Sequence, residues 1–201
     1  MNSKVIHAPI ENLYSTYKTY LVGAMECTAD KDFGKGWRDV LKPKLEEYGI
    51  YVFDPTREEK EKVGVDTKEF HKKLMGWKAS GNWDIYTREM DKIWRGRTYL
   101  DEEGKLRHLP GDKDYVDQSD FITAHVNSND RPCGTYVEIG MAWLFNIPIY
   151  LITDSPKTEL NGSLLYFVLN SGGEVFRSTN EYLEYIIKEY NLKRMKKNGK
   201  A

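Results

Sequence analysis

The sequence predicts an α/β protein in which helices cover both faces of a mostly parallel sheet. Short apolar runs typical of buried strands recur along the chain, segments with helical spacing separate them, and glycine or proline stands at many boundaries. Parallel strands need a crossover connection, and a helix between two strands supplies one. These observations favour a sheet that is buried on both sides.

The first element is a strand within residues 18–25, where the apolar run YLVG ends in glycine. A helix is predicted over residues 34–49, with Gly49 in the position of a C-terminal cap. Pro43 lies inside this pattern, so it either kinks the helix or marks its start. The second strand covers residues 50–56. The apolar residues at helical spacing are Trp37, Val40, Leu41 and Leu45.

Residues 57–111 give a less regular pattern and are interpreted as an insertion. A charged stretch comes first, and a helix is predicted over residues 82–96. The remaining part, RTYLDEEGKLRHLPGD, predicts a hairpin that turns at Glu103–Gly104.

The alternation is regular again after residue 111. The predicted elements are a short helix over 112–119, a strand over 120–126, a loop over 127–134, a helix over 135–145, a strand over 147–152, a helix over 163–171, a strand over 174–178 and a helix over 179–192. Because no linker is recognisable, the chain is predicted to be one domain, 1–201, of Rossmann-like or flavodoxin-like architecture. Such folds bind ligands at the carboxyl ends of their strands.

Composition narrows the classes of function. Thirty basic and 31 acidic side chains leave a formal charge of −1, so no overall basic field recruits a nucleic acid polymer. The apolar runs are too short to span a bilayer, and residues 1–18 do not resemble a signal peptide. Two cysteines, Cys27 and Cys133, make no disulfide framework. We expect a cytoplasmic protein that is not attached to a membrane.

Common catalytic signatures are missing from the sequence. No GxGxxG follows a strand, and neither GxxxxGK[ST] nor HExxH occurs. The four histidines are scattered, so neither a metal site nor a Ser-His-Asp arrangement can be argued from them. His125, the only one in a clearly predicted strand, is interpreted as structural. The candidates for chemistry are therefore carboxylates.

Glu138 has the most informative position among the carboxylates. It follows a glycine-containing loop at the carboxyl end of a predicted central strand, where this architecture places its site. Thr135 and Glu138 also have the S/T-x-x-E spacing of a capping box, which is a structural role. The same spacing occurs at Thr56–Glu59 and Ser178–Glu181, so spacing alone does not decide between catalyst and cap.

Several aspartates are further candidates, although each also suits a turn or a helix cap. The aspartates considered are Asp54, Asp112, Asp117, Asp120 and Asp130. We expect several of these carboxylates to gather near the ends of adjacent strands.

Four pieces of the chain, in this order, resemble the nucleoside 2-deoxyribosyltransferase superfamily, which includes nucleotide N-glycoside hydrolases. YLVGAM is similar to the opening strand and glycine turn of the superfamily, and YVFDPT to its second strand. DKDYVDQSDFITAH is similar to its D-x7-D block, and CGTYVEIGMAW to its G-T/M-x-E-I/L-G-x-A helix start.

The resemblance implies roles for single residues. Glu138 matches the nucleophile, Asp112 an aspartate that contacts the base or assists its protonation, and Tyr20 a first-strand tyrosine that hydrogen-bonds the nucleophile. The transferases carry a second aspartate six residues before the nucleophile; here Pro132 occupies that position, and Asp130 is the nearest candidate. The implied substrate-binding residues are Gly23, Asp54, Asp130, Gly134 and Thr135.

The resemblance further implies cleavage of the N-glycosidic bond of 2′-deoxynucleosides, with exchange of the nucleobase through a deoxyribosyl-enzyme intermediate on a glutamate. Retaining glycosidases follow the same logic, with one carboxylate as nucleophile and another as acid. No metal or redox cofactor is implied, the ligands are small nucleosides, nucleotides and nucleobases, and a homo-oligomer is expected.

Two alternatives stay open. One is a hydrolase of nucleoside 5′-monophosphates on the same scaffold, in which Lys31, Lys35 and Arg38 hold the phosphate; we favour a solvated basic face for these three. The other is a non-catalytic nucleotide-binding module.

In the insertion, Trp83, Tyr86 and Glu89 are candidates for a base pocket.

Overall fold

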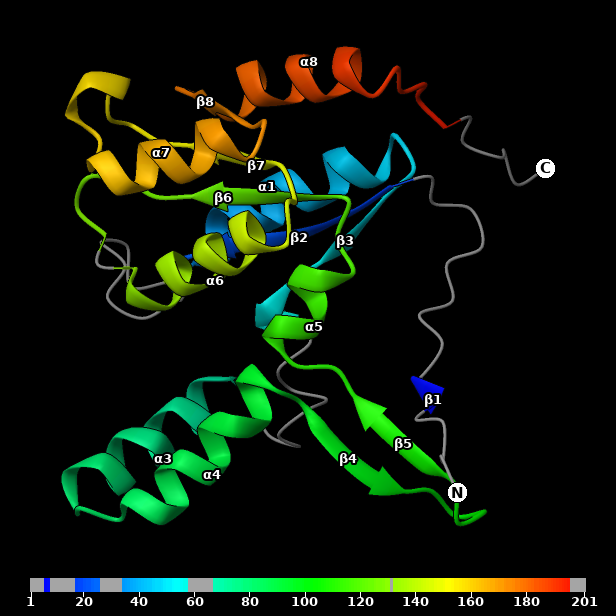
Figure 1. The fold of residues 1–201 in the computed structure, drawn as a ribbon, viewed down its shortest axis with the longest axis vertical. Helices are drawn as coiled ribbons and strands as arrows, with labels where there is room; N and C mark the ends of the chain where they lie inside the picture. Colours follow the sequence, from blue (N-terminus) through cyan, green and yellow to red (C-terminus); the bar gives the residue numbers. More distant parts are fainter. Residues whose placement is uncertain (1–5, 8–16, 26–33, 58–66, 131, 196–201) are drawn as a thin grey trace. The chain divides into compact units, whose positions relative to one another are not determined.

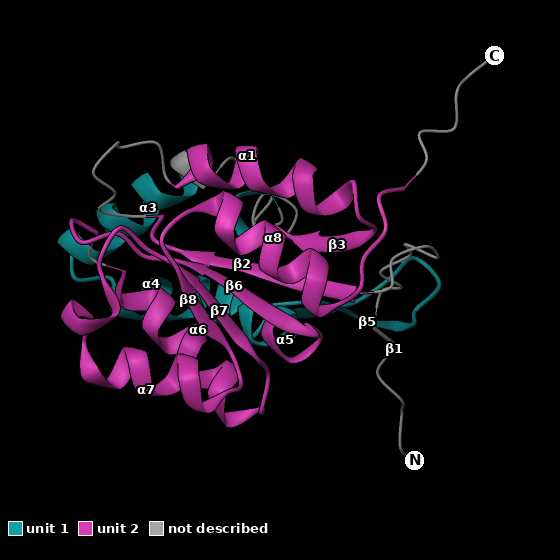
Figure 2. Ribbon diagram, turned by 90° about the horizontal axis from the view of Figure 1, so that it is seen from above, with its two compact units in different colours: residues 1–11, 55–115 teal, residues 12–54, 116–201 magenta. Residues whose placement is uncertain are grey.

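The computed structural model describes residues 6–7, 17–25, 34–57, 67–130 and 132–195 (Figure 1). The chain divides into two compact units. Unit 1 comprises Met1–Glu11 and Pro55–Tyr115, and unit 2 comprises Asn12–Asp54 and Val116–Ala201 (Figure 2). The insertion predicted over 57–111 falls within unit 1. The interpretation of the chain as a single domain stays a prediction.

A five-stranded parallel sheet forms the centre of unit 2. Its strands pair in the order β3-β2-β6-β7-β8, and every pair is parallel. Counted along the chain within this sheet, that order is 2-1-3-4-5, the flavodoxin-like order, so the predicted fold class is confirmed. The strands are β2 (Tyr17–Gly23), β3 (Ile50–Phe53), β6 (Phe121–His125), β7 (Ile149–Ile152) and β8 (Glu174–Phe176).

Helices cover both faces of this sheet (Figure 2). α1 (Lys35–Glu46) and α8 (Thr179–Glu189) lie on one face, and α6 (Cys133–Leu144) and α7 (Gly162–Asn170) lie on the other. Side chains alternate along a strand, so Leu21 packs with α1 and α8 while its neighbour Tyr20 points to α6. β2 is therefore buried on both sides, as the sequence predicted.

Helix α1 begins at Lys35 and runs through Pro43, so the alternative that Pro43 marks its start is wrong. Gly49 follows the helix with a φ of 75°, a conformation that favours glycine. Val40, expected on the apolar side of this helix, is 54% exposed. The buried stripe consists of Arg38, Leu41 and Leu45, so an arginine occupies a core position.

The carboxyl ends of β2 and β6 meet where the strand order reverses. Gly23, the last residue of β2, pairs there with His125, the last residue of β6. In open α/β sheets the crevice outside these strand ends is the usual place for a ligand.

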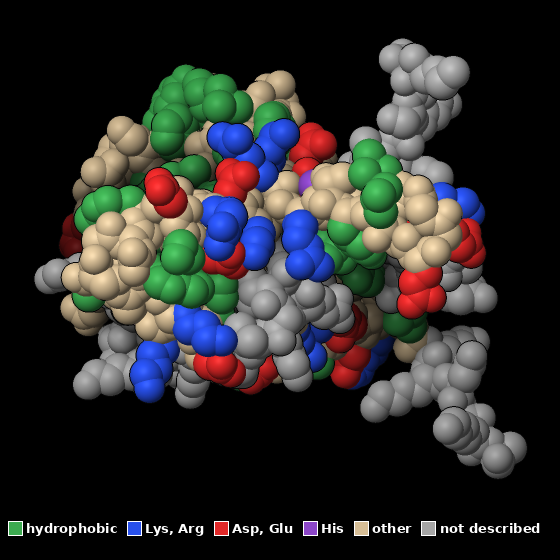
Figure 3. Space-filling view, turned by 90° about the horizontal axis from the view of Figure 1, so that it is seen from below, with side chains coloured by type: hydrophobic (Ala, Val, Ile, Leu, Met, Phe, Trp, Pro, Cys, Tyr) green, Lys and Arg blue, Asp and Glu red, His purple; other side chains and the backbone are tan. Residues whose placement is uncertain are grey.

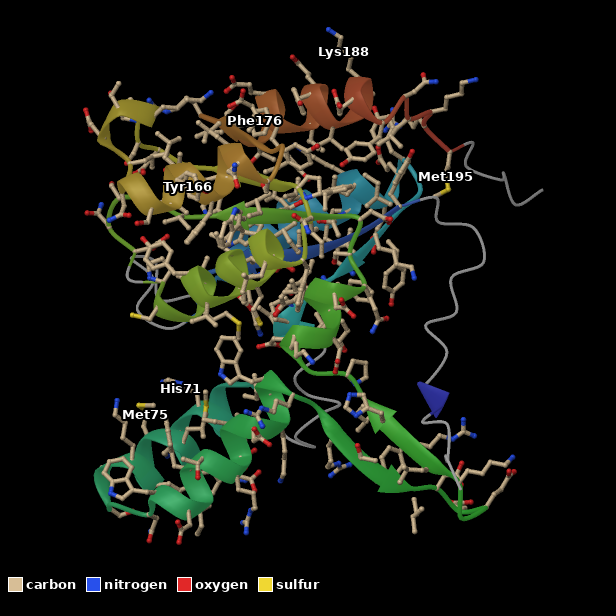
Figure 4. All side chains as sticks on the ribbon, in the orientation of Figure 1. His71, Met75, Tyr166, Phe176, Lys188 and Met195 are labelled. Carbon is tan, nitrogen blue, oxygen red and sulfur yellow. The ribbon has the colours of Figure 1, made fainter. Side chains whose placement is uncertain are left out.

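Strand β8 forms one edge of the sheet, and its core side chain Phe176 packs against α8 (Figure 4). The carbonyl of Phe176 accepts a hydrogen bond from Thr153 on the β7 side. The neighbouring amide of Val175 points the other way, because successive residues alternate in direction, and it donates to Oε1 of Glu174 at 2.7 Å. Lys157 forms an ion pair with the same carboxylate oxygen.

Unit 1 contains a three-stranded sheet and a pair of helices. β5 (Leu106–Leu109) lies between β1 (Ile6–His7) and β4 (Arg97–Leu100), parallel to the first and antiparallel to the second. β4 and β5 form the predicted hairpin. The helices α3 (Thr67–Ala79) and α4 (Trp83–Trp94) share a small core of Phe70, Leu74 and Ile93.

Acidic and basic side chains are interspersed over the face drawn in Figure 3, in keeping with the nearly balanced charge of the chain. Within the described ranges, no helix has the length and apolar character needed to cross a membrane.

Candidate active site

Glu138 is a buried carboxylate that contacts strand β2 of unit 2. The residue is only 7% exposed, and its Oε1 accepts a hydrogen bond from the hydroxyl of Tyr20 at 3.0 Å. Tyr20 itself is fully buried in β2. The structure thus contains the hydrogen bond that the family resemblance implied between a first-strand tyrosine and this glutamate.

The capping-box interpretation of Thr135 and Glu138 is wrong. Helix α6 starts at Cys133, with Pro132 as its N-cap and no side-chain capping bond. Thr135 is therefore the third helical residue and Glu138 the sixth, one turn beyond the amides that a capping carboxylate serves. The helix dipole falls off within its first turn, and the Glu138 carboxylate accepts a hydrogen bond from β2 beyond it.

The same S/T-x-x-E spacing at Ser178–Glu181 does correspond to a helix cap. Ser178 is the N-cap of α8, and its Oγ accepts a hydrogen bond from the amide of Glu181 at 3.2 Å. The Glu181 carboxylate accepts in turn from the amide of Arg177. Glu59, in the third match, lies outside the described residues. The same spacing therefore has two different structural meanings in this chain.

Gly23 lies beneath an aromatic stack at the end of β2. The indole of Trp37 and the imidazole of His125 are stacked, with ring centroids 4.8 Å apart and planes 12° apart. A Cβ on Gly23 would lie 2.8 Å from Cζ2 of Trp37 and 2.9 Å from the carbonyl oxygen of His125. Packing thus requires glycine here, and its predicted role in substrate binding stays a prediction.

Arg38 and Asp54 form a buried ion pair, with 3.9 Å between Nε and Oδ1 and no exposure of either side chain. The Arg38 guanidinium also donates to the carbonyl oxygens of Leu21, Gly23 and Gly34. The solvated basic face that we favoured for Arg38 is therefore wrong. Arg38 joins the ends of β2 and β3 to the start of α1.

His125 lies among several charges at the carboxyl end of β6. Burial lowers the pKa of its imidazole, and the charge of Arg38 adds to this effect. Asp130 and Asp154 act in the opposite direction without reversing it. The interpretation of His125 as a structural residue agrees with its stacked position.

The loop between β6 and α6 is held to the end of β7. Asp154 accepts hydrogen bonds from the amide of Ser128 at 2.7 Å and from its hydroxyl at 2.8 Å. Burial raises the pKa of Asp154, but these two hydrogen bonds, together with those from its own backbone amide and from Ser155, outweigh it and leave the pKa lowered. Asp130 closes the same loop by accepting from the amide of Asn127. Its carboxylate has the turn-forming contact that was weighed against a substrate role.

Asp120, Gly134 and Thr135 belong to unit 2. Asp120 accepts from the amide of Lys18 and joins the starts of β2 and β6. Gly134, in the first turn of α6, is exposed, whereas Thr135 is buried. Asp112 belongs to unit 1, where it is 6% exposed at the start of α5 (Asp112–Asp117).

The proposed base-pocket residues of the insertion lie on α4. Trp83 is 57% exposed and meets Tyr86 edge to face. Burial raises the pKa of Glu89, but Lys92, at 2.6 Å, and Arg88 together outweigh it and leave the pKa lowered. Across the part of the chain that the structure describes, no group of three or more His, Cys, Asp or Glu is arranged to hold a metal ion.

Sequence reasoning missed Ser128 and Asp154, and it gave Trp37 and Arg38 roles other than the contacts described above. Arg38 could have been found, because it shares the three- and four-residue spacing of Leu41 and Leu45 and is a charge on an apolar stripe. Ser128 and Asp154 are 26 positions apart, and no local pattern links them.

The fold and the buried carboxylate define a flavodoxin-like α/β protein with a Tyr–Glu pair between strand β2 and a covering helix. No family profile and no curated protein matches the chain. Its fold is shared with a conserved protein from Enterococcus faecalis V583, at 16% identity over 86% of this chain and 98% of that one, with a TM-score of 0.50.

Two other solved structures are similar to the chain. One is a 2-deoxyribosyltransferase from the psychrotolerant bacterium Bacillus psychrosaccharolyticus, at 14% identity over 89% of this chain and 99% of that one, with a TM-score of 0.48. The other is the CMP N-glycosidase of Clostridium botulinum, at 17% identity over 84% and 97%, with a TM-score of 0.45. At these identities the likeness concerns the fold.

Proposed function

We propose that this protein cleaves the N-glycosidic bond of 2′-deoxynucleosides and transfers the deoxyribosyl group between nucleobases, with Glu138 as the nucleophile. The observation that carries the proposal is the buried hydrogen bond between Tyr20 and Glu138. A purely capping glutamate would face the amides of its own helix start, whereas this carboxylate faces strand β2. The order of the four sequence motifs supports the same assignment.

The chemistry follows from a double displacement. A carboxylate oxygen of Glu138 attacks C1′ while the C1′–N bond breaks, its electron pair goes to the base, and a proton from the Asp112 carboxyl passes to the base. The acceptor base then attacks C1′ through its own nitrogen. The ester bond to Glu138 breaks, and the acceptor proton returns to Asp112. Two displacements retain the configuration at C1′.

Tyr20 has a positioning role in this scheme. Its hydroxyl fixes the orientation of the Glu138 carboxylate, since the hydrogen bond is buried and both partners are held by packing. The assignments of Asp112 as acid and of Gly23, Asp54, Asp130, Gly134 and Thr135 as substrate-binding residues rest on the resemblance.

We also propose that copies of the chain associate through α6 and α7. These helices expose a set of large apolar side chains, of which Tyr166 is labelled in Figure 4. Such a set favours a protein interface over solvent. Light scattering of the wild type and of a Leu144→Glu variant tests this, and a wild type that is monomeric would contradict it. The set comprises Tyr136, Val137, Leu144, Phe145, Tyr166 and Leu169.

The activity is tested by incubating the protein with deoxyadenosine and cytosine and following deoxycytidine and adenine by chromatography. We expect exchange with the wild type and none above the blank with Glu138→Gln. Glu181→Gln is the matched control, because it alters a real capping glutamate of the same spacing and should leave exchange unchanged. Exchange that persists in Glu138→Gln overturns the assignment.

Two further arms separate the alternatives. Base released from dCMP, with none from deoxynucleosides, identifies the 5′-monophosphate hydrolase. A thermal shift by nucleotides without any released base identifies a binding module. A nucleoside analogue with fluorine at the 2′ position of its sugar should slow breakdown of the sugar–enzyme intermediate. Its sugar should then stay attached to the peptide that contains Glu138. A label on another residue would contradict the assignment of Glu138 as the nucleophile.

A further inference from the structure

The start of helix α5 is held by one carboxylate. Oδ2 of Asp114 accepts a hydrogen bond from the amide of Gly111 at 2.8 Å and is 2.7 Å from Nε2 of His108. Gly111 precedes the helix, and its carbonyl accepts in turn from the amides of Asp114 and Tyr115. Gly111 and Asp114 therefore exchange two hydrogen bonds across the first turn of α5, one through each backbone amide. His108 connects this turn to β5.

His108 is in contact at both ring nitrogens. An ionised Asp114 only accepts, so Nε2 carries the hydrogen of that bond. Nδ1 lies 3.2 Å from Oγ1 of Thr98, the residue opposite His108 in the hairpin. Since the ring is fixed from both sides, it transmits the position of the β4–β5 hairpin to α5.

A close backbone crossing adds to this connection between the β4–β5 hairpin and α5, which we call the joint. A Cβ on Gly111 would lie 2.3 Å from the amide nitrogen of Gly96, the residue before β4. Gly96 itself has a φ of +77°. The chain entering β4 and the chain entering α5 thus touch directly, which leaves no space for a side chain at Gly111.

Asp112 is the first residue of the helix whose start these contacts hold. It lies in sequence between Gly111 and Asp114, and it is only 6% exposed. We propose that His108, through Asp114, is the positioning residue for Asp112, and that the hairpin thereby sets the place of the acid of the reaction. This inference rests on the proposed function, in which Asp112 protonates the leaving base.

The test compares two nucleosides that differ in their need for an acid. The adenine of deoxyadenosine needs a proton in order to leave, whereas the base of 7-methyl-2′-deoxyguanosine already carries a positive charge. We expect His108→Ala to lower kcat on deoxyadenosine by about tenfold or more, a part of what a general acid supplies. On the cationic substrate, corrected for spontaneous release, kcat should stay within about twofold of the wild type, because no proton is needed there.

Arg107→Ala is the matched control. Arg107 neighbours His108 on β5 and pairs with Asp101 at 2.7 Å, so its loss removes a polar contact within the hairpin and leaves the contact between His108 and Asp114 in place. Both substrates should react normally with it. Should His108→Ala not fold, Asp114→Asn, which keeps an acceptor for Gly111 but loses the charge, is used in the same comparison.

An equal loss on both substrates, or no loss on either, overturns the inference while the proposed function survives. Hydrogen exchange gives a readout that needs no activity. Faster exchange at the amides of Asp114 and Tyr115 in His108→Ala, but not in Arg107→Ala, supports the joint, and unchanged exchange overturns it. A wild type that releases no base from any nucleoside refutes the proposed function and, with it, the catalytic sense of the joint.

Discussion

The hydroxyl of Tyr20 and Oε1 of Glu138 are 3.0 Å apart, and this hydrogen bond ties strand β2 to helix α6. Tyr20 is fully buried and Glu138 is 7% exposed, so the bond also satisfies a carboxylate that folding removes from water. The place of this carboxylate is thus set by the sheet and not by the start of its helix.

Replacing Tyr20 by Phe should reduce both stability and activity. Loss of the buried hydrogen bond should cost about 1–2 kcal/mol of unfolding free energy. Base exchange should fall about ten- to a hundredfold, because the Glu138 carboxylate loses its fixed orientation. Urea denaturation and chromatography measure the two effects.

Tyr182→Phe is the control for that substitution. Tyr182 is equally buried, and its hydroxyl lies 2.6 Å from Oγ1 of Thr123 on the other face of the sheet. It should lose a similar amount of stability and keep its activity. If both variants lose activity alike, Tyr20 has no special relation to the chemistry.

Breaking the buried ion pair should be the most damaging of the changes considered. Arg38→Met leaves the Asp54 carboxylate in the interior without this cation and should cost about 3–5 kcal/mol. Arg95→Met removes an exposed ion pair with Asp91 and should change stability by less than about 1 kcal/mol. Comparable urea midpoints for the two variants would contradict a structural role of the Arg38–Asp54 pair.

A methyl group at Gly23 should not be tolerated. Gly23→Ala would place its Cβ against Trp37 and a backbone carbonyl, and overpacking of this kind costs about 1–3 kcal/mol. Gly76→Ala is the control, since its Cβ would meet nothing within 4 Å in α3, and it should stabilise by about 0.4–1 kcal/mol. Thermal or urea unfolding measures both, and a Gly23→Ala variant as stable as the wild type would refute the close packing.

Stability should fall as the pH drops below the ordinary histidine value of 6.5, in part because of His125. Its folded-state pKa is lowered, so between that pKa and 6.5 the unfolded chain binds more protons, and acid favours unfolding. His125→Phe keeps a ring against Trp37 but does not titrate, so its stability should decline less from pH 8 to pH 5. Asp154, whose lowered pKa favours the folded state, acts in a separate window, where stability is lost only below its ordinary value of 3.8. Parallel urea titrations at several pH values decide; identical pH slopes would exclude His125.

The alternation of strands and helices was predictable, because burial of each strand and the amphipathic pattern of each helix are local properties of the sequence. The start of α6 was not. Pro132 serves as its N-cap without a side-chain bond, so the helix begins two residues before Thr135, where the capping spacing had placed it. Glu138 was selected for its position after a strand-end loop, and its contact with Tyr20 came only from the family resemblance. Arg38 and Asp54 meet across two elements, and such a pair is invisible to patterns that compare neighbouring residues.

The edge strand β8 has a consequence for how copies of this chain can meet. Its outward amide, that of Val175, already donates to the Glu174 carboxylate, which Lys157 holds by an ion pair. A free amide at a sheet edge is what lets an incoming strand extend the sheet, and a charged side chain in that place discourages it. Growth of the sheet from one molecule into the next is therefore discouraged at this edge.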